Sequence, residues 1–254
     1  MAGKRLGQHF LIRRALLARL AEAACPEREP LVIEIGPGRG ALTEYLLERA
    51  GRVVALEIDA ELVGVLRAKF EGEERLEVLE ADVLGTRLGQ WGPAVVAGNL
   101  PYYITSPILA RIFAMGPLLR RAVILTQEEV ARRITARPGT RAYGYLTVET
   151  QLFTRPEILF TLAPSAFRPA PQVRSAAVRL TPRAEQAPDP APFLQFAARC
   201  FRQKRKTLRN NLAPHYGSRI DEQPEAGLRA EQLSLEQLRD LFARLERQGS
   251  GPLY

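Results

Sequence analysis

The run Asn99-Leu100-Pro101-Tyr102 follows an apolar segment that is typical of a short core strand. An exocyclic aromatic amine is a poor nucleophile because its lone pair is delocalised into the ring, and accepting hydrogen bonds from its N–H groups shifts electron density onto the nitrogen. Asn99 carries a side-chain carbonyl, Leu100 a backbone carbonyl, and Pro101 fixes their relative direction. Tyr102 offers a ring on which an extracted base can stack. A plain turn would not need the two aromatics Tyr102 and Tyr103, so the run predicts a site that holds an aromatic amine.

A glycine-rich loop comes earlier, in the segment VIEIGPGRGALTEYL. Gly36 and Gly38 allow a tight turn and a close approach of a ligand to the backbone. Glu57 ends the next expected strand, where a carboxylate can accept hydrogen bonds from ribose hydroxyls, and Asp82 follows the third, near the expected adenine edge. The Gly-x-Gly-x-Gly spacing differs from the dinucleotide fingerprint, and Pro37 removes an N–H that a pyrophosphate would use. These features favour S-adenosylmethionine (SAM) over NAD, although each acid taken alone is also compatible with a solvated strand end.

The elements that must position these residues alternate along the chain. Short apolar runs that read as strands are separated by amphipathic runs that read as helices, which predicts an α/β fold with a parallel sheet covered by helices. Two later expected strands lie close together in the sequence, which predicts antiparallel strands at one edge of the sheet. The expected strands are Leu31–Ile35, Val53–Leu56, Leu76–Leu79, Ala94–Ala97, Ala122–Leu125, Leu159–Leu162 and Ala176–Leu180, and the expected helices are Ala41–Ala50, Ala60–Phe70 and Pro107–Phe113.

A change in composition divides the chain. Residues 1–180 are expected to form the catalytic, SAM-binding domain, and residues 181–192, with four prolines in twelve positions, a linker. Residues 193–254 are expected to form a small all-α domain with helices over Phe193–Leu212 and Ser234–Leu245. Ser234 and Gln237 have the spacing of a capping box at the start of the second of these helices.

The net charge of +8 is concentrated locally. The segment FAARCFRQKRKTLRNNL carries six basic residues and no acid. Helical phase would place Phe201, Lys204, Leu208 and Leu212 inward. A solvated face is one interpretation, and contact with nucleic-acid phosphates is the other. The residues predicted on the outer side to bind RNA are Arg202, Arg205, Lys206 and Arg209.

Cysteine and histidine are too sparse for a metal cluster, since the chain has two of each. We therefore expect no metal and read Cys25 and Cys200 as reduced structural thiols. No apolar run approaches the length of a membrane span, and the first residues, MAGKRLGQHFLIRR, do not resemble a secretory signal. The expectation is a cytoplasmic protein without a membrane partner.

The glycine loop, the two acids and the Asn-Leu-Pro-Tyr run, in this order, resemble the amino-directed class I methyltransferases. Further segments resemble one branch, the small-subunit (16S) rRNA adenine N6,N6-dimethyltransferases of the KsgA family. The resemblance covers nearly the whole chain, and the last two segments are the most specific. The segments are LGQHFL (6–11), TQEEVARRI (126–134), PGTRAYGYLTV (138–148), PSAFRPAPQVRS (164–175) and FRQKRKTLRNNL (201–212).

This resemblance implies a Rossmann-like class I methyltransferase sheet followed by a small C-terminal all-α domain. It implies transfer of methyl groups from SAM to N6 of two adjacent adenosines near the 3′ end of 16S rRNA during small-subunit biogenesis. The partner would be small-subunit rRNA or the immature 30S subunit, and we expect a monomer.

The resemblance also assigns roles to individual residues. The Gln8–Leu11 stretch would close over the cofactor, with His9 and Leu11 touching it, and Phe167 would form the side of the base clamp opposite Tyr102. The family commonly has Asn where this chain has His9, so a backbone contact carries over and a side-chain amide contact does not. The remaining cofactor contacts would come from Gly36, Gly38, Glu57, Asp82 and Asn99.

Three alternatives remain. A large-subunit rRNA adenine methyltransferase of the macrolide-resistance type shares the catalytic segment, but FRQKRKTLRNNL favours the small-subunit branch. A DNA adenine methyltransferase is disfavoured because the family-specific segments span both expected domains. A non-catalytic ribosome-assembly or transcription factor on the same fold is disfavoured because Asn99, Glu57 and Asp82 are intact.

Overall fold

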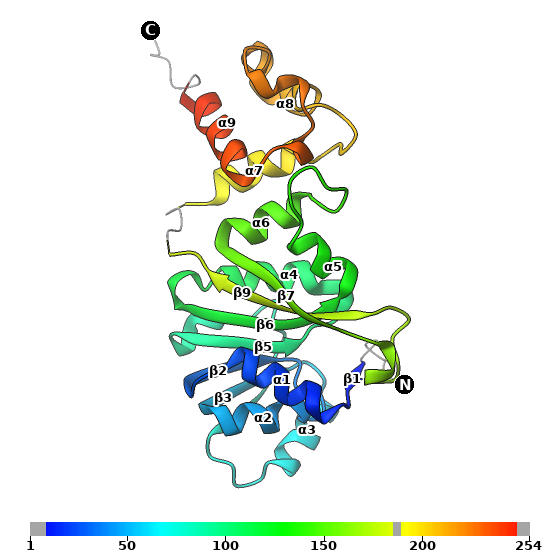
Figure 1. Ribbon diagram of the computed structural model, residues 1–254. Coiled ribbons are helices and arrows are strands. Elements are labelled where there is room, and N and C mark those ends of the chain that lie inside the picture. Colours follow the sequence, from blue (N-terminus) through cyan, green and yellow to red (C-terminus); the bar gives the residue numbers. More distant parts are fainter. Residues whose placement is uncertain (1–8, 185–188, 248–254) are drawn as a thin grey trace. The chain divides into compact units, whose positions relative to one another are not determined.

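The computed structural model describes residues 9–184 and 189–247 (Figure 1). The described chain divides into two compact units. The first consists of the described part of Met1–Ala131 together with Thr154–Pro182, and the second of Arg132–Phe153 together with the described part of Arg183–Tyr254.

The first unit is built on a seven-stranded sheet of order β4-β3-β2-β5-β6-β9-β7 (Figure 1). The five strands from β4 to β6 are parallel, and β9 runs antiparallel to both β6 and β7. The predicted Rossmann-like α/β fold and its antiparallel edge are therefore confirmed. The strands are β2 (Glu29–Ile35), β3 (Ala50–Glu57), β4 (Leu76–Glu80), β5 (Ala94–Asn99), β6 (Leu119–Gln127), β7 (Thr154–Leu162) and β9 (Ser175–Pro182).

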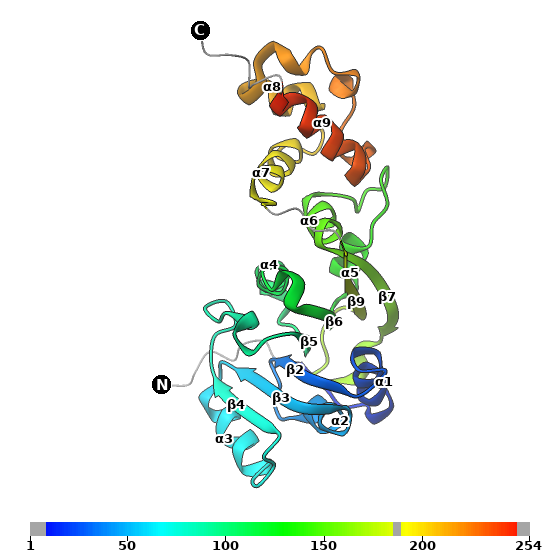
Figure 2. The same ribbon diagram turned by 90° about the vertical axis from the view of Figure 1, so that its left-hand side faces the viewer.

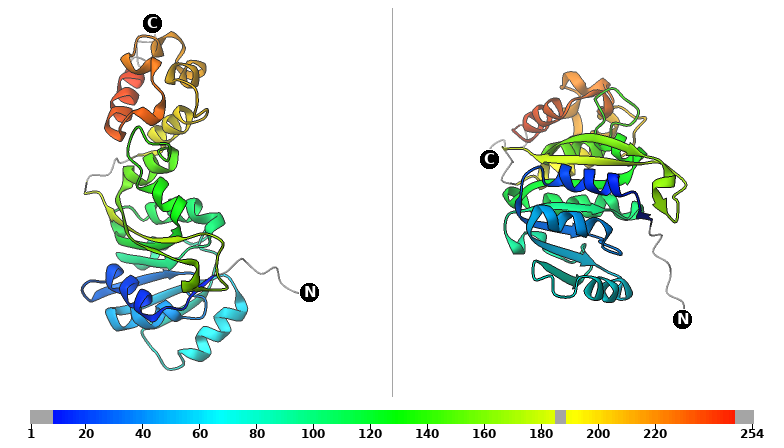
Figure 3. Two further views of the ribbon diagram at one scale, coloured as in Figure 1. Left: turned by 45° about the vertical axis from the view of Figure 1, so that its right-hand side comes forward. Right: turned by 60° about the horizontal axis from the view of Figure 1, so that its bottom comes forward.

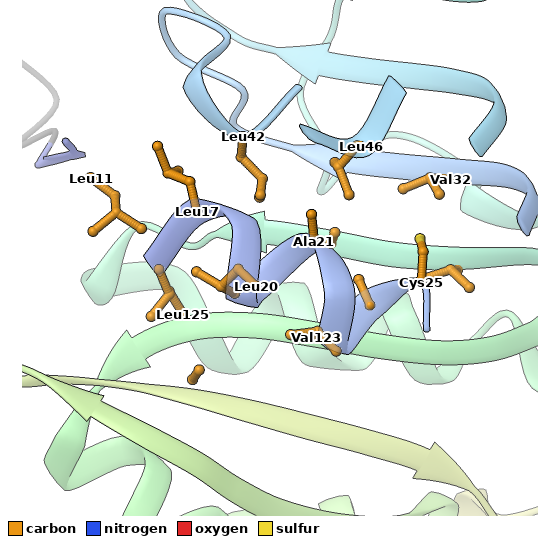
Figure 4. Close-up of a cluster of buried hydrophobic side chains, with 14 of the residues drawn as sticks. Leu11, Leu17, Leu20, Ala21, Cys25, Val32, Leu42, Leu46, Val123 and Leu125 are labelled. Carbon is orange, nitrogen blue, oxygen red and sulfur yellow. The ribbon is translucent and has the colours of Figure 1, made fainter. Parts of the chain in front are cut away.

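Helices cover both faces of this sheet. The helices α1 (Arg14–Ala24) and α2 (Ala41–Arg49) lie on one face, and α4 (Thr105–Phe113) lies on the other (Figure 2; Figure 3). The central strands are consequently apolar at successive positions: Val32 belongs to the core under α1 and α2, and its neighbour Ile33 is equally buried (Figure 4). The helix α3 (Ala60–Lys69) lies between β3 and β4 in the sequence and contacts both strands.

The second unit is helical and has its own core. Its helices are α6 (Tyr145–Phe153), α7 (Ala191–Cys200), α8 (Leu208–Tyr216) and α9 (Leu235–Arg247), and the short α5 (Glu128–Ile134) begins in the first unit and ends in the second. Phe196 and Leu238 are fully buried in this core. The predicted capping box opens α9, because the amide of Gln237 donates to Ser234 Oγ (3.2 Å) and the amide of Ser234 donates to Gln237 Oε1 (2.8 Å). None of the described helices is long and apolar enough to cross a lipid bilayer.

The predicted helix over Phe193–Leu212 is wrong. α7 ends at Cys200, a turn occupies residues 201–207, and α8 begins after Thr207, whose hydroxyl accepts from the amide of Asn210 (3.4 Å). The side chain of Asn211 holds the turn, because its Nδ2 donates to the carbonyls of Cys200 (2.9 Å) and Gln203 (3.2 Å). The predicted division of this segment into an inward and an outer side assumed one continuous helix and therefore does not apply.

The boundary between the compact units also differs from the one expected at residue 180. Residues 132–153 belong with the C-terminal unit because Val148 and Leu152 of α6 pack in its core. The linker expected over residues 181–192 is shorter, since β9 extends to Pro182 and α7 begins at Ala191. Residues 185–188 of that linker lie outside the described residues.

Candidate functional site

A pocket opens at the carboxyl ends of the parallel strands, where ligands bind in open α/β sheets. It has a volume of about 850 Å³ including the space open to solvent, which suffices for a nucleoside-sized ligand. The structure brings most of the predicted site residues to its wall. Those are His9, Gly36, Gly38, Glu57, Asp82, Asn99, Leu100, Pro101 and Tyr102.

The carboxylate of Glu57 joins the glycine loop to the end of β3. Its Oε2 accepts from the amide of Gly38 (3.0 Å), and its Oε1 accepts from the amides of Ile58 (3.0 Å) and Asp59 (3.1 Å). The residue is only 3% exposed, so the alternative of a solvated strand end is wrong for Glu57. Gly38 has a φ of +59°, which favours glycine, and an added Cβ would lie 2.6 Å from the ring of Phe10.

Asp82 lies beyond the end of β4 at the exposed side of the pocket. Its Oδ1 accepts from the amide of Leu84 (2.8 Å), which fixes the turn after the strand. The amide of Ala81 donates to the carbonyl of Glu57 (2.8 Å) and so keeps the ends of β3 and β4 in register. Acidic residues from the ends of two neighbouring strands consequently line the pocket.

Asn99 is the last residue of β5, and only the nitrogen of its side-chain amide has a hydrogen-bond partner among the described residues. Nδ2 donates to the backbone carbonyl of His9 (2.7 Å). Because a carbonyl only accepts, this contact fixes which end of the amide faces His9. Oδ1 is buried and has no hydrogen-bond partner among the described residues, a situation that costs free energy unless a ligand supplies a donor.

The segment after Asn99 is held rigidly. The amide of Leu100 donates to the carbonyl of Leu125 (3.0 Å). The buried hydroxyl of Thr105 contacts the carbonyl of Pro101 (3.3 Å) and the hydroxyl of Thr126 (3.1 Å). The backbone that presents the pocket residues 99–102 is therefore fixed from both β6 and α4.

Tyr102 is anchored at its hydroxyl, which lies 2.6 Å from Ser175 Oγ on β9. Burial raises the pKa of Tyr102 above its ordinary value, more than the Ser175 contact lowers it, so the phenol stays protonated at neutral pH. The imidazole of His9 stacks on this ring with a centroid distance of 5.9 Å and an interplanar angle of 25°. His9 Nδ1 is in turn 2.8 Å from the carbonyl of Pro169.

Two predicted site residues are not in this pocket. Phe167 is 2% exposed and packs in the hydrophobic core, and Leu11, 5% exposed, packs in the same core (Figure 4 shows Leu11). They are register partners in the small sheet formed by β1 (Phe10–Leu11) and β8 (Phe167–Arg168), which directs both side chains into apolar surroundings. The prediction that Phe167 faces Tyr102 across the clamp thus finds no support in the described pocket wall, where the ring that stacks on Tyr102 is that of His9. Gln8, the start of the predicted closing stretch, lies outside the described residues.

Three residues at the site carried no role in the sequence interpretation. Phe10 and Ile58 line the pocket, and Ser175 fixes Tyr102. The aromatic of LGQHFL was a usable signal for Phe10, and an apolar residue directly after a strand-end acid was one for Ile58. Ser175 ends the segment PSAFRPAPQVRS, but no spacing in the sequence indicates that its hydroxyl contacts Tyr102.

The predicted RNA-binding residues belong to the second unit. Arg202, Arg205 and Lys206 are exposed in the turn between α7 and α8. Arg209 lies on α8 and forms an ion pair with Asp221 (2.7 Å), both side chains being about half exposed. The turn therefore presents these three cations together, whereas its fourth cation, Lys204, lies 3.9 Å from the carboxylate of Glu231 and Arg209 has Asp221 beside it.

Comparisons with known proteins place this geometry in context. A family model described as "Ribosomal RNA adenine dimethylase" matches residues 2–247. The chain is 44% identical to the "Ribosomal RNA small subunit methyltransferase A" of Acidobacterium capsulatum, over 95% of this chain and 90% of that one. It resembles the crystal structure of a dimethyladenosine transferase from Plasmodium falciparum with a TM-score of 0.83, 26% identity and coverage of 95% and 98%. It also resembles the 23S rRNA methyltransferase ErmE, with a TM-score of 0.74, 32% identity and coverage of 93% and 99%.

Proposed function

We propose, from the premise that the chain belongs to the ribosomal RNA adenine dimethylase family, that it transfers methyl groups from SAM to N6 of two adjacent adenosines near the 3′ end of small-subunit rRNA. The chain is an rRNA adenine dimethyltransferase. The single observation that carries the chemistry is the buried Oδ1 of Asn99, which has no hydrogen-bond partner among the described residues and lies in a pocket that also contains the ring of Tyr102. An acceptor in that position suits an N–H donor on a flat aromatic ring.

The pocket residues fit SAM. Ribose hydroxyls need acceptors, and Glu57 and Asp82 bring carboxylates to neighbouring strand ends. Ile58, which lines the pocket and is 54% exposed, offers apolar surface for an adenine face. The described residues that line the pocket include no lysine or arginine, as suits a ligand without phosphate. When bound, SAM supplies the electrophilic methyl group.

The residues of the chain activate and hold the amine. Oδ1 of Asn99 accepts one N–H of the adenine amine and the carbonyl of Leu100 accepts the other, so that electron density shifts onto N6. The contact with His9 fixes Oδ1 in advance, which is the preorganisation that makes polar groups effective in catalysis. Tyr102 holds the adenine by stacking, and its phenol stays neutral, so it does not act as a proton acceptor. No proton acceptor from the protein is required, because N6 becomes acidic once it is alkylated and releases its proton to water.

The rRNA substrate would be held by the second unit as well as by the pocket. We propose that Arg202, Arg205 and Lys206, and more weakly Arg209, contact rRNA phosphates and position the substrate without reading its sequence. The assembled substrate would be the immature 30S subunit, on which the protein would act as a monomer. The large-subunit alternative is not favoured, because the relative that is 44% identical carries the small-subunit name.

The test is to incubate the protein with SAM and either naked small-subunit rRNA or immature small subunits, and to map N6,N6-dimethyladenosine by mass spectrometry of RNA fragments. We expect two adjacent modified adenosines near the 3′ end. Large-subunit rRNA in a parallel reaction is the matched control. Modification of that RNA instead, or of neither, would contradict the proposal.

A further inference from the structure

Tyr103 presents an aromatic ring to solvent at the mouth of the pocket. It is 67% exposed and is the sole aromatic among the exposed large hydrophobic side chains of the described residues. Large aromatic rings ordinarily gain most by burial. Within the part of the chain that the structure describes, its hydroxyl makes no hydrogen bond, so neither packing nor a polar contact accounts for its position.

The backbone beneath this ring is fixed. Tyr103 is the central residue of the short 3₁₀ turn Tyr102–Ile104, in which the amide of Ile104 donates to the carbonyl of Pro101 (3.2 Å). Successive side chains of a 3₁₀ turn point about 120° apart. The rings of Tyr102 and Tyr103 therefore face different directions from one rigid support, and the first is held by Ser175 while the second is bare.

The two exposed apolar residues of the pocket, Ile58 and Tyr103, can be assigned to its cofactor side or its amine side from the residue that precedes each in the chain. Ile58 directly follows Glu57 and belongs with the carboxylates that suit the cofactor ribose. Tyr103 directly follows Tyr102 and belongs with the amine-binding side. A ligand that covers Tyr103 should thus be part of the nucleic-acid substrate.

We propose that Tyr103 is the stacking platform for the nucleotide adjacent to the target adenosine, an inference that rests on the proposed function. Extracting a base from its strand leaves the face of the neighbouring base without a partner, and an aromatic side chain can replace that partner. The platform would select a target that has a flanking base over an isolated adenosine. When the two target adenosines are adjacent, it would hold one while the other occupies the pocket.

The experiment is a double-mutant cycle between protein and RNA. The protein is wild type or Tyr103→Ala, and the RNA is a short single strand of the 3′-end target sequence with either adenosine or an abasic nucleotide at the flanking position. In the presence of S-adenosylhomocysteine, we expect the abasic nucleotide to weaken binding to wild type on the order of tenfold and to leave binding to Tyr103→Ala unchanged. Tyr103→Phe, which keeps the ring, should behave as wild type.

Two controls make the result specific. Val65→Ala removes another exposed apolar side chain, 45% exposed on α3, and should respond to the abasic nucleotide as wild type does. Affinity for S-adenosylhomocysteine should be the same in all variants, which shows that the pocket is intact. An equal loss on the abasic RNA in wild type and Tyr103→Ala, or no loss in wild type, would overturn the platform. Wild type that binds the RNA but methylates no adenosine would instead overturn the proposed function.

Discussion

Asn99 and His9 are joined by a hydrogen bond of 2.7 Å in which the amide nitrogen of Asn99 donates to the backbone carbonyl of His9. The orientation of the group that we propose to activate the amine is therefore set by the backbone of a segment 90 residues away in the sequence. Because the contact uses only the carbonyl, it does not require a particular side chain at position 9. The histidine at position 9 is therefore compatible with it.

Asn99→Ala should reduce methyl transfer by about 100-fold or more, because it removes a preorganised acceptor. The free energy of unfolding should change little, since the lost hydrogen bond to His9 is offset by the removal of a buried oxygen that has no partner among the described residues. Single-turnover kinetics and urea unfolding measure the two effects. Near-wild-type turnover would contradict the proposed polarisation of the amine.

Glu57→Gln should weaken binding of S-adenosylhomocysteine on the order of tenfold. The two carboxylate oxygens of Glu57 accept from three backbone N–H groups, whereas the amide of glutamine has only one oxygen that can accept. Calorimetric titration measures the dissociation constant. RNA affinity should be unchanged. Glu61→Gln, an exposed acid in the first turn of α3, is the matched control and should bind as wild type does. Equal dissociation constants for the two variants would mean that Glu57 has no part in the cofactor site.

Glu34 on β2 should make stability depend on pH. Burial raises its pKa to about 7 from an ordinary 4.5, more than the hydrogen bond from Thr43 (2.6 Å) lowers it. Between these values the unfolded chain has released the proton and the folded chain retains it. The free energy of unfolding should therefore fall as the pH rises from about 5 to about 8, by on the order of 3 kcal/mol.

The measurement for Glu34 is urea unfolding of wild type and Glu34→Gln at both ends of that pH range. The neutral amide cannot titrate, so Glu34→Gln should lack this component of the pH dependence and gain stability relative to wild type as the pH rises. A constant difference between the two proteins across the range would show that Glu34 does not retain its proton in the folded state.

The basic turn should contribute to rRNA binding through charge. Changing Arg202, Arg205 and Lys206 together to Gln should weaken rRNA binding and flatten its dependence on salt, because fewer counterions are released. Affinity for S-adenosylhomocysteine should not change. A charge-matched control changes three exposed arginines of the first unit, Arg14, Arg28 and Arg87. Equal losses in both triple variants would assign binding to net charge and not to the turn.

The strand-end residues of the site could be predicted from the sequence because parallel strands bring their carboxyl ends to one edge of a sheet. Gly36, Glu57 and Asn99 each follow or end an apolar run, and the topology alone brings them together. The position of Phe167 could not be predicted in this way. It depends on the pairing of β1 with β8, two-residue strands from distant segments with no periodic pattern to reveal them.

The break between α7 and α8 shows the same limit. The residues Phe193–Leu212 have helical periodicity and contain no glycine or proline, so local preference favours one helix. A single buried side chain, Asn211, reaches back to the end of α7 and stabilises the turn by hydrogen bonds that no sequence pattern indicates. The polar contact outweighs the local preference.

Asn211 is consequently expected to be a positioning residue for the basic turn. Besides its two Nδ2 contacts, its Oδ1 accepts from the amide of Gln203 (3.1 Å), and the residue is 6% exposed. Asn211→Asp keeps the size and the acceptor but replaces the donor with a carboxylate oxygen facing two carbonyls, which should disorder the turn. We expect rRNA affinity to fall on the order of tenfold, with a smaller salt dependence, as the three cations lose their common arrangement.

Asn210→Asp makes the same change of charge at the next, exposed position of α8 and is the matched control. It should weaken rRNA binding only by the electrostatic effect of one added negative charge, whereas Asn211→Asp should weaken it further. Thermal unfolding of both variants, and an unchanged affinity for S-adenosylhomocysteine in the first unit, would separate loss of the turn from loss of the fold. If the two variants bind rRNA equally well and with the same salt dependence, the order imposed by Asn211 has no role in binding, and the cations of the turn act as independent charges.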